Sequence, residues 1–200
     1  MIEIEKKLRY TPENEKQLAA AAQFIGEKKI HDIYYDTVDY ALTTKDWWLR
    51  RRDHGWELKT VIVSGNFSRR EIDSYHELED DESIRKALNL PHRGTLQDDL
   101  ESAGYHPFAD FVTTRRKYRL DEFTIDLDQV DFGDFSCRVG EVELKIERTE
   151  DMAQAQSRIV NVANRFGFQM GNTLGKVVQY IKARRPEHFQ ALVRADVVDE

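Results

Sequence analysis

Charged side chains in this sequence recur at every second position along several short runs of apolar residues. Because alternate side chains of an extended strand point to the same face, each run would present its charges together. The positions are Glu3, Glu5 and Lys7; Arg50 and Arg52 beside Trp48; Glu57 and Lys59; Arg115, Lys117 and Arg119; Asp126 and Asp128; and Glu141, Glu143 and Lys145. Carboxylates so arrayed bind divalent metal ions, whereas guanidinium and ammonium groups bind phosphate.

The charges are also segregated by sign. Residues 111–120 hold four cations and no acid, whereas residues 121–134 hold six acids and no base. For any one strand a solvated polar face explains such a pattern well. Across all the strands, separate cationic and acidic zones favour a ligand that is anionic in one part and metal-bound in another.

Charge counting points to a triphosphate, which carries about four negative charges near neutral pH. The cations available to it are Lys7, Arg50, Arg52, Lys59, Arg115 and Lys176. The acids that would repel it are Glu3, Glu5, Asp126, Glu141 and Glu143. Mg²⁺ or Mn²⁺ lying between carboxylate and phosphate oxygens would remove that repulsion.

The elements that carry these charges are predicted to be mostly strands. The expected strands cover residues 2–8, 29–37, 47–52, 56–63, 67–77, 111–120, 123–130 and 138–147. Turn residues at 53–55, 64–66 and 121–122 predict tight hairpin connections. Many short strands joined by short turns favour an antiparallel sheet or barrel.

Helices are predicted between and after these strands from caps and from apolar residues spaced on one face. The expected helices run from Thr11 to Ile25, from Thr95 to Gly104, from Thr149 to Gly167 and from Leu174 to Lys182. Residues 186–200 are expected to form a short helix or tail and carry no motif residue.

Composition limits the class of protein. The net charge of −7 and the pI near 5.5 argue against a general nucleic-acid binder. Cys137 stands alone, which excludes an intrachain disulfide framework and fits a reducing compartment. No apolar run approaches the roughly 20 residues of a bilayer span. We therefore expect one cytoplasmic domain over residues 1–200, monomeric, acting on a small molecule without nucleic-acid or membrane partners.

Several of these motifs, taken in order, resemble the CYTH, or triphosphate tunnel metalloenzyme, superfamily. They are Glu3-x-Glu5-x-Lys7, Tyr34-Tyr35-Asp36-Thr37, Trp48-Leu49-Arg50-Arg51-Arg52, Gly55-Trp56-Glu57-Leu58-Lys59, Arg115, Asp126-Leu127-Asp128, Gly140-Glu141-Val142-Glu143 and Lys176. Together they span residues 2–182. The runs at 48–52 and 55–59 are most similar to the thiamine-triphosphatase branch of that superfamily.

The resemblance implies an α+β fold in which an eight-stranded antiparallel β-barrel forms a closed tunnel, with helices packed outside. It implies hydrolysis of thiamine triphosphate to thiamine diphosphate and phosphate, with Mg²⁺, or Mn²⁺, as the cofactor. The implied metal ligands are Glu3, Glu5, Asp126, Glu141 and Glu143, and the implied phosphate ligands are Lys7, Arg50, Arg52, Lys59, Arg115 and Lys176. Lys59 would lie near the scissile phosphate with Tyr34 as its hydrogen-bonding neighbour.

Two roles stay open at this point. Lys59 could act as a base if burial and nearby arginines lowered its pKa well below about 10.4, or it could stay charged and only bind phosphate. Trp48 shares a face with Arg50 and could stack on a cationic thiazolium at the tunnel mouth. Trp47, on the opposite face, is expected to pack against a helix.

Three other functions remain as alternatives. Inorganic triphosphate would fit the same tunnel without an aromatic platform. An adenylate cyclase of the same superfamily would release pyrophosphate and would need an adenine pocket. A non-catalytic polyphosphate- or nucleotide-binding module would have no need of the carboxylates.

Overall fold

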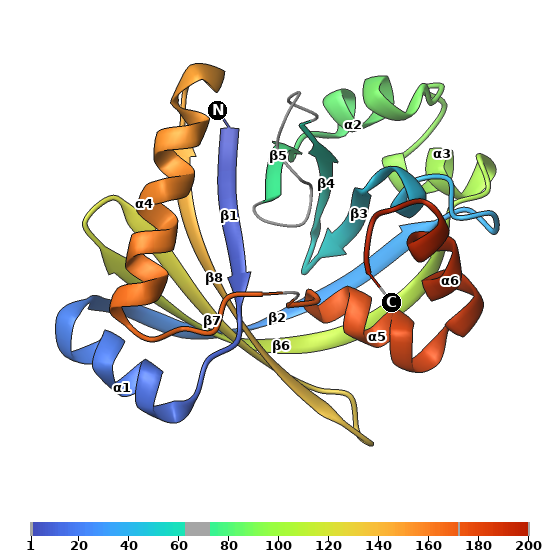
Figure 1. Cartoon of the computed structure of the whole chain (residues 1–200). Helices are drawn as coiled ribbons and strands as arrows, with labels where there is room; N and C mark the ends of the chain where they lie inside the picture. The colour runs from blue at the N-terminus through green and yellow to red at the C-terminus, as the bar shows by residue number, and fades with distance from the viewer. Residues whose placement is uncertain (1, 63–72, 172, 200) are drawn as a thin grey trace.

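The computed structural model describes residues 2–62, 73–171 and 173–199 (Figure 1). The strands are β1 (Ile2–Leu8), β2 (Gln23–Asp36), β3 (Trp47–Arg52), β4 (Gly55–Val61), β5 (Asp73–Leu78), β6 (His106–Leu120), β7 (Phe123–Asp131) and β8 (Ser136–Ile146). The helices are α1 (Pro12–Ala21), α2 (Asp81–Leu88), α3 (Leu96–Ser102), α4 (Met152–Arg165), α5 (Lys176–Arg184) and α6 (Pro186–Arg194). Two short 3₁₀ helices, η1 (Thr43–Lys45) and η2 (Thr149–Asp151), precede β3 and α4.

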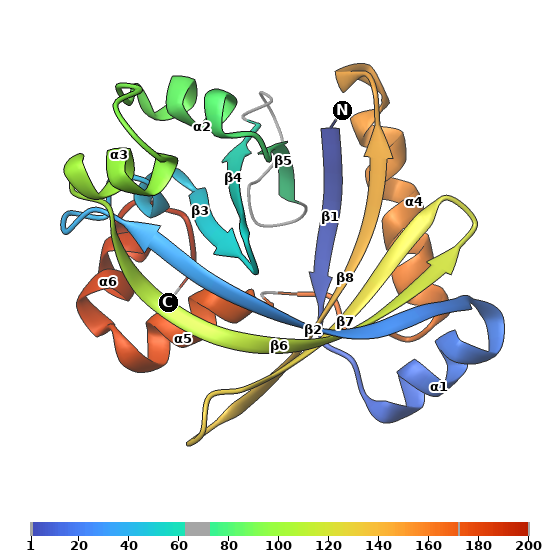
Figure 2. The same cartoon turned by 180° about the vertical axis from the view of Figure 1, so that it is seen from behind.

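The strands pair into a closed ring. Their order is β1, β5, β4, β3, β2, β6, β7 and β8, and β8 pairs again with β1. Every neighbouring pair is antiparallel. The helices lie around the outside of the ring (Figures 1 and 2). The predicted α+β fold, an eight-stranded antiparallel barrel with outer helices, is confirmed.

Tight turns join the strands at two of the predicted positions. Asp53 follows β3 with a φ of 51°, and Asp121 follows β6 with a φ of 52°. Aspartate tolerates this left-handed conformation because its short side chain can hydrogen-bond to the local backbone. The turn predicted at 64–66 and the first part of the strand predicted at 67–77 lie outside the described residues.

The apolar cores lie between the ring and the helices. α4 packs on β1 and β8, where Ile4 and Ile159 are fully buried. α5 and α6 cover a second cluster that includes Ile181, and α2 and α3 cover a third that includes Leu58 and Ile84. Burying such a side chain is worth about 1.5–3 kcal/mol. Since the apolar faces of the strands point outward onto the helices, their charged faces point into the ring.

The first helix was predicted too long. α1 ends at Ala21, and Phe24, Ile25 and Gly26 belong to β2, in which Gly26 pairs with Lys117 of β6. Aromatic and β-branched residues favour extended backbone, and pairing with a long neighbouring strand overrides their helical spacing. β2 and β6 consequently begin earlier than the strands predicted at 29–37 and 111–120.

Helix α2 was not predicted. Its eight residues offer too short an apolar pattern, but its ends carry clear signals. Asp80 caps the first turn by accepting a hydrogen bond of 2.8 Å from Ser83 N, and Asn89 ends the helix with a φ of 53°. The later helices follow the prediction closely, with Thr95 capping α3 and residues 186–194 forming α6. Among the described helices, none has the length and apolar character required to cross a bilayer.

Candidate active site

A cavity of about 180 Å³ opens inside the ring. Most of the predicted site residues line it: Glu5, Lys7, Tyr34, Trp48, Arg50, Arg52, Lys59, Arg115, Glu141, Glu143 and Lys176. The other two, Glu3 and Asp126, are buried and form ion pairs with Lys59 and Arg115, which line it. Side chains of opposite charge from separate strands therefore converge on one interior space.

Two arginines of β3 form one cationic wall of the cavity. The Arg50 guanidinium donates from Nε to Glu57 Oε2 at 2.8 Å, and Arg52 Nε donates to Asp32 Oδ1 at 2.8 Å. Burial would raise the pKa of Asp32, but the positive charges of Arg50, Arg52 and Lys176 outweigh it and lower that pKa. The carboxylates of Asp32 and Glu57 thus hold both guanidinium groups in place at the cavity surface.

Asp128 pairs with two further predicted phosphate ligands, Arg115 and Lys176, although it was not predicted as a site residue. Arg115 donates to its two carboxylate oxygens from Nε at 2.6 Å and from Nη2 at 2.7 Å. Lys176 Nζ, at the start of α5, donates to Asp128 Oδ2 at 2.5 Å. This bidentate pairing between Arg115 and Asp128 fixes the plane of the guanidinium group, as is usual for an arginine and a carboxylate. The signal for Asp128 was its place two residues after Asp126 on the same strand face.

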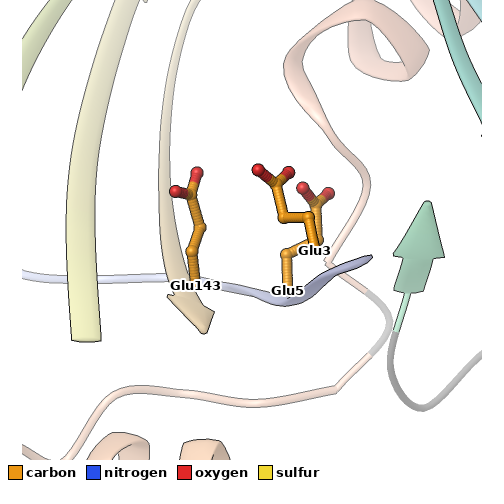
Figure 3. Close-up of side chains that lie close together, drawn as sticks. All are labelled: Glu3, Glu5 and Glu143. Carbon is orange, nitrogen blue, oxygen red and sulfur yellow. The ribbon is translucent and has the colours of Figure 1, made fainter. Parts of the chain in front are cut away.

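Three of the five predicted metal ligands gather in one cluster. Oxygen atoms of Glu3, Glu5 and Glu143 lie within 4.8 Å of one another, and Figure 3 shows the three carboxylates pointing to the same side. β1 supplies the first two and β8 supplies the third, because Glu5 pairs directly with Glu143 in the β1–β8 register. All-oxygen donors at this spacing suit a hard divalent cation such as Mg²⁺ or Mn²⁺.

The charge state of the cluster also fits a cation. Burial, reinforced by neighbouring carboxylates, raises the pKa of Glu3 to about 8 and that of Glu143 to about 7. Burial acts in the same direction on Glu5, but Lys59 and Lys7 lower its pKa well below the usual value. The raised pKa values of Glu3 and Glu143 mean that protons would compete with a divalent cation for these two carboxylates near neutral pH.

The other two predicted metal ligands lie nearer the cationic side. Asp126 forms ion pairs with Arg115 and, from Oδ1, with Lys117 Nζ at 3.0 Å. Glu141 Oε2 lies 3.4 Å from Arg115 Nη2. The structure thus divides the five acids into the trio Glu3, Glu5 and Glu143 and a pair, Asp126 and Glu141, beside Arg115.

Lys59 forms ion pairs with two members of the acidic trio, Glu3 and Glu5, and with Glu77 of β5. Its Nζ is 2.8 Å from Glu3 Oε1, 2.9 Å from Glu5 Oε2 and 3.2 Å from Glu77 Oε1. Burial alone would lower the pKa of Lys59, but these three carboxylates raise it well above the usual value. The carboxylates, rather than the arginines, therefore set its charge, which favours the alternative in which Lys59 stays charged.

The expected hydrogen bond between Tyr34 and Lys59 is not among the contacts of the described residues. Tyr34 lies opposite Arg50 in the β2–β3 register, and its hydroxyl accepts from Arg50 Nη1 at 3.2 Å. Lys59 instead approaches the ring of Tyr75 at 5.6 Å. Tyr34 and Lys59 line the same cavity from different strands.

Trp48 is held at the cavity by a residue that sequence reasoning missed. Its Nε1 donates to Asp46 Oδ1 at 2.7 Å, and Tyr75 donates from its hydroxyl to the same oxygen at 3.2 Å. Asp46 is buried in a left-handed conformation with a φ of 60° directly before β3. Trp47, on the opposite face, packs against the cluster under α2 and α3, as predicted.

Two segments without motif residues also line the cavity. One leads into α5 and comprises Gly171, Thr173, Leu174 and Gly175. At Gly175 a Cβ would lie 3.2 Å from Lys7 Cε, so a larger residue there would press on a predicted phosphate ligand. The other segment, residues 197–199, follows α6. Both segments lack regular secondary structure, and the helix predicted from Leu174 begins at Lys176 instead.

Comparison with known proteins agrees with this geometry. The CYTH domain profile matches residues 1–177 of the chain. The chain belongs to the CYTH domain family. This CYTH domain is 29% identical over 211 residues to the thiamine-triphosphatase of Macaca fascicularis, covering 98% of this chain and 91% of the relative. It is 29% identical over 214 residues to the thiamine-triphosphatase of Homo sapiens, with the same shares covered.

Solved structures show the same fold. The PH1819 protein of Pyrococcus horikoshii superposes on this CYTH domain with a TM-score of 0.67 and 18% identity, over 91% of this chain and 99% of that one. HpAC1 of Hippeastrum superposes with a TM-score of 0.58 and 15% identity, over 91% of this chain and 95% of that one.

Proposed function

We propose that this CYTH domain hydrolyses thiamine triphosphate to thiamine diphosphate and phosphate with Mg²⁺, for which Mn²⁺ could substitute. The observation that carries the proposal is a cavity lined both by the cationic wall and by Glu5 and Glu143 of the carboxylate trio, with Trp48 in the same lining. The relatives named thiamine-triphosphatase support the choice of substrate. The acidic pI supports a small molecule rather than nucleic acid as the substrate, the lone cysteine supports the cytoplasm, and the proposal takes the protein as a monomer.

In this proposal the cations bind the triphosphate chain. Arg50, Arg52 and Arg115 present guanidinium groups whose orientation the neighbouring carboxylates already fix. These side chains therefore lose little conformational entropy when the substrate binds. Lys7 and Lys176 add point charges from β1 and α5. Together they stabilise negative charge that develops on the bridging oxygen when the bond to the terminal phosphorus breaks.

The acidic side would hold the metal. Glu3, Glu5 and Glu143 are the proposed ligands, with Asp126 and Glu141 extending the site. A bound Mg²⁺ would neutralise phosphate oxygens and so allow the substrate to approach the carboxylates. Lys59, kept charged by its carboxylate neighbours, would donate to an oxygen of the scissile phosphate, and Tyr34 would help to hold Arg50.

The reaction itself transfers the terminal phosphoryl group to water. A water oxygen bonds to the terminal phosphorus and releases a proton to solvent, the bond to the bridging oxygen breaks, and the diphosphate leaves with the bonding electrons. The ring of strands around the cavity limits the access of other nucleophiles. Inorganic triphosphate is the second candidate substrate, since the cationic wall needs no organic group and HpAC1 is described as having a dominant triphosphatase activity.

The test is phosphate release from thiamine triphosphate, inorganic triphosphate and ATP, compared by kcat/KM with Mg²⁺. We expect the highest value for thiamine triphosphate. Trp48→Ala should lower the ratio of thiamine triphosphate to inorganic triphosphate turnover by about tenfold, since a cation over tryptophan is worth about 1–2 kcal/mol. A higher value for inorganic triphosphate would select the second candidate, and pyrophosphate release from ATP would select a cyclase.

A further inference from the structure

The chain returns to the cavity after α6. Asp196 turns the backbone with a φ of 57°, and two backbone hydrogen bonds of 3.0 Å, from Asp196 N and Val197 N, tie the turn to α6. Val197, Val198 and Asp199 then line the same cavity as the predicted site residues. Figures 1 and 2 both show this end of the chain beside α5.

The two valines make part of the cavity apolar. They pack against the cluster that α5 and α6 cover, and the side chain of Trp48 packs against the same cluster. The apolar residues in the cavity lining are Trp48, Leu174, Val177, Val178, Val197 and Val198. A triphosphate chain gains nothing from such a surface, because its oxygens need charged or polar partners. The apolar lining therefore suits the organic part of a substrate.

Two carboxylates accompany this apolar lining. Asp46 is buried and fixes the indole of Trp48 through the hydrogen bond of 2.7 Å. Asp199 lines the cavity from the segment after α6. Negative charge in the same lining as a tryptophan favours a ring that carries positive charge, because both the carboxylates and the indole quadrupole attract it.

We propose that Val197, Val198 and Asp199 form, with Trp48, the subsite for the organic group of the substrate. This subsite selects an aromatic ring that carries a positive charge and makes apolar contacts with the two valines. The inference rests on the proposed function for the placement of the phosphates. It assigns substrate selection to a segment that lies outside the matched family region of residues 1–177. The valines provide the apolar contact and Asp199 provides charge complementarity.

The test compares two ligands that differ by the organic group. The dissociation constants of thiamine diphosphate and of pyrophosphate are measured by calorimetry with Mg²⁺ for the wild type and for Val197→Ser/Val198→Ser. We expect the double substitution to weaken thiamine diphosphate by about tenfold, the effect of losing a few buried methyl groups. Pyrophosphate binding should change by less than about twofold. Val38→Ser, on an 84% exposed side chain, is the matched control and should change neither.

Two further variants keep the test decisive. Val198→Ala serves if the double variant loses its folded circular-dichroism spectrum, and it should weaken thiamine diphosphate several-fold. Asp199→Asn should weaken thiamine diphosphate and leave pyrophosphate unchanged or bound more tightly. Equal changes for both ligands, or no change for thiamine diphosphate, would overturn the subsite. Absence of phosphate release with the binding difference intact would instead remove the proposed hydrolysis and leave the subsite standing.

Discussion

Acid should weaken the attachment of α6 to the strand ring through one buried histidine. The ring of His188 is fully buried and stacks on Tyr40 at a centroid distance of 4.0 Å. Its Nε2 lies 2.7 Å from Thr43 Oγ1 in η1. Burial lowers the pKa of His188 from 6.5 to about 4; Arg185 adds to this effect and Asp36 opposes it. The folded protein therefore holds a neutral imidazole down to a pH at which the unfolded chain would protonate it.

The sign and size of the effect follow from this difference. Between pH 6.5 and about 4 the unfolded chain binds the extra proton, so stability falls as the pH falls through that window and is fully present above it. At about 1.4 kcal/mol per pKa unit, the loss is about 3 kcal/mol. Because α6 leads into residues 197–199, the same protonation would loosen one wall of the cavity.

The assay is urea unfolding of the wild type and of His188→Asn at several pH values from about 7.5 to about 4. Other titrating groups contribute to both proteins and cancel in the difference. We expect the wild type to lose about 3 kcal/mol more than the variant across this range. His54→Asn, at an exposed position, should follow the wild type. Parallel curves for the wild type and His188→Asn would refute the reasoning.

Three further predictions concern the tunnel. Lys59→Arg should keep the shape of the pH–rate profile, since three carboxylates hold the side chain charged; a displaced limb would show that Lys59 titrates during turnover. Gly140→Ala should cost about 1–3 kcal/mol in urea unfolding, because its Cβ would collide with Leu8 Cδ1, and unchanged stability would contradict this. Arg115→Ala should cost about 3–5 kcal/mol because it removes an ion-pair partner from each of the buried carboxylates Asp126 and Asp128, whereas Arg119→Ala, which is exposed, should cost little; equal losses would disprove the distinction.

The face on which each charged side chain lies could be predicted from the sequence because the strand period is two. Glu3, Glu5 and Lys7 share a face whatever strand lies beside them. The identity of their partners could not be predicted in this way. Lys59 reaches Glu3 and Glu5 because β5 alone separates β1 from β4 in the ring, and that order depends on the whole chain.

Residues outside the strands were the harder part of the prediction. Asp46 depends on a left-handed turn before β3, and residues 197–199 depend on how α6 packs, so neither leaves a periodic pattern in the sequence. Ile25 shows the opposite error, in which a helical spacing was overridden by pairing between β2 and β6. Local pattern therefore predicted the strand faces, whereas tertiary packing determined which residues outside the strands line the cavity.

The most direct test of the central claim is the Mg²⁺ dependence of phosphate release from thiamine triphosphate. The account predicts no release in excess EDTA and restoration by Mg²⁺. It also predicts that Glu143→Gln, within the carboxylate trio, needs at least about tenfold more Mg²⁺, whereas Glu147→Gln, an exposed neighbour, behaves as the wild type. Release that persists in EDTA, or the same Mg²⁺ midpoint for Glu143→Gln and the wild type, would contradict the account.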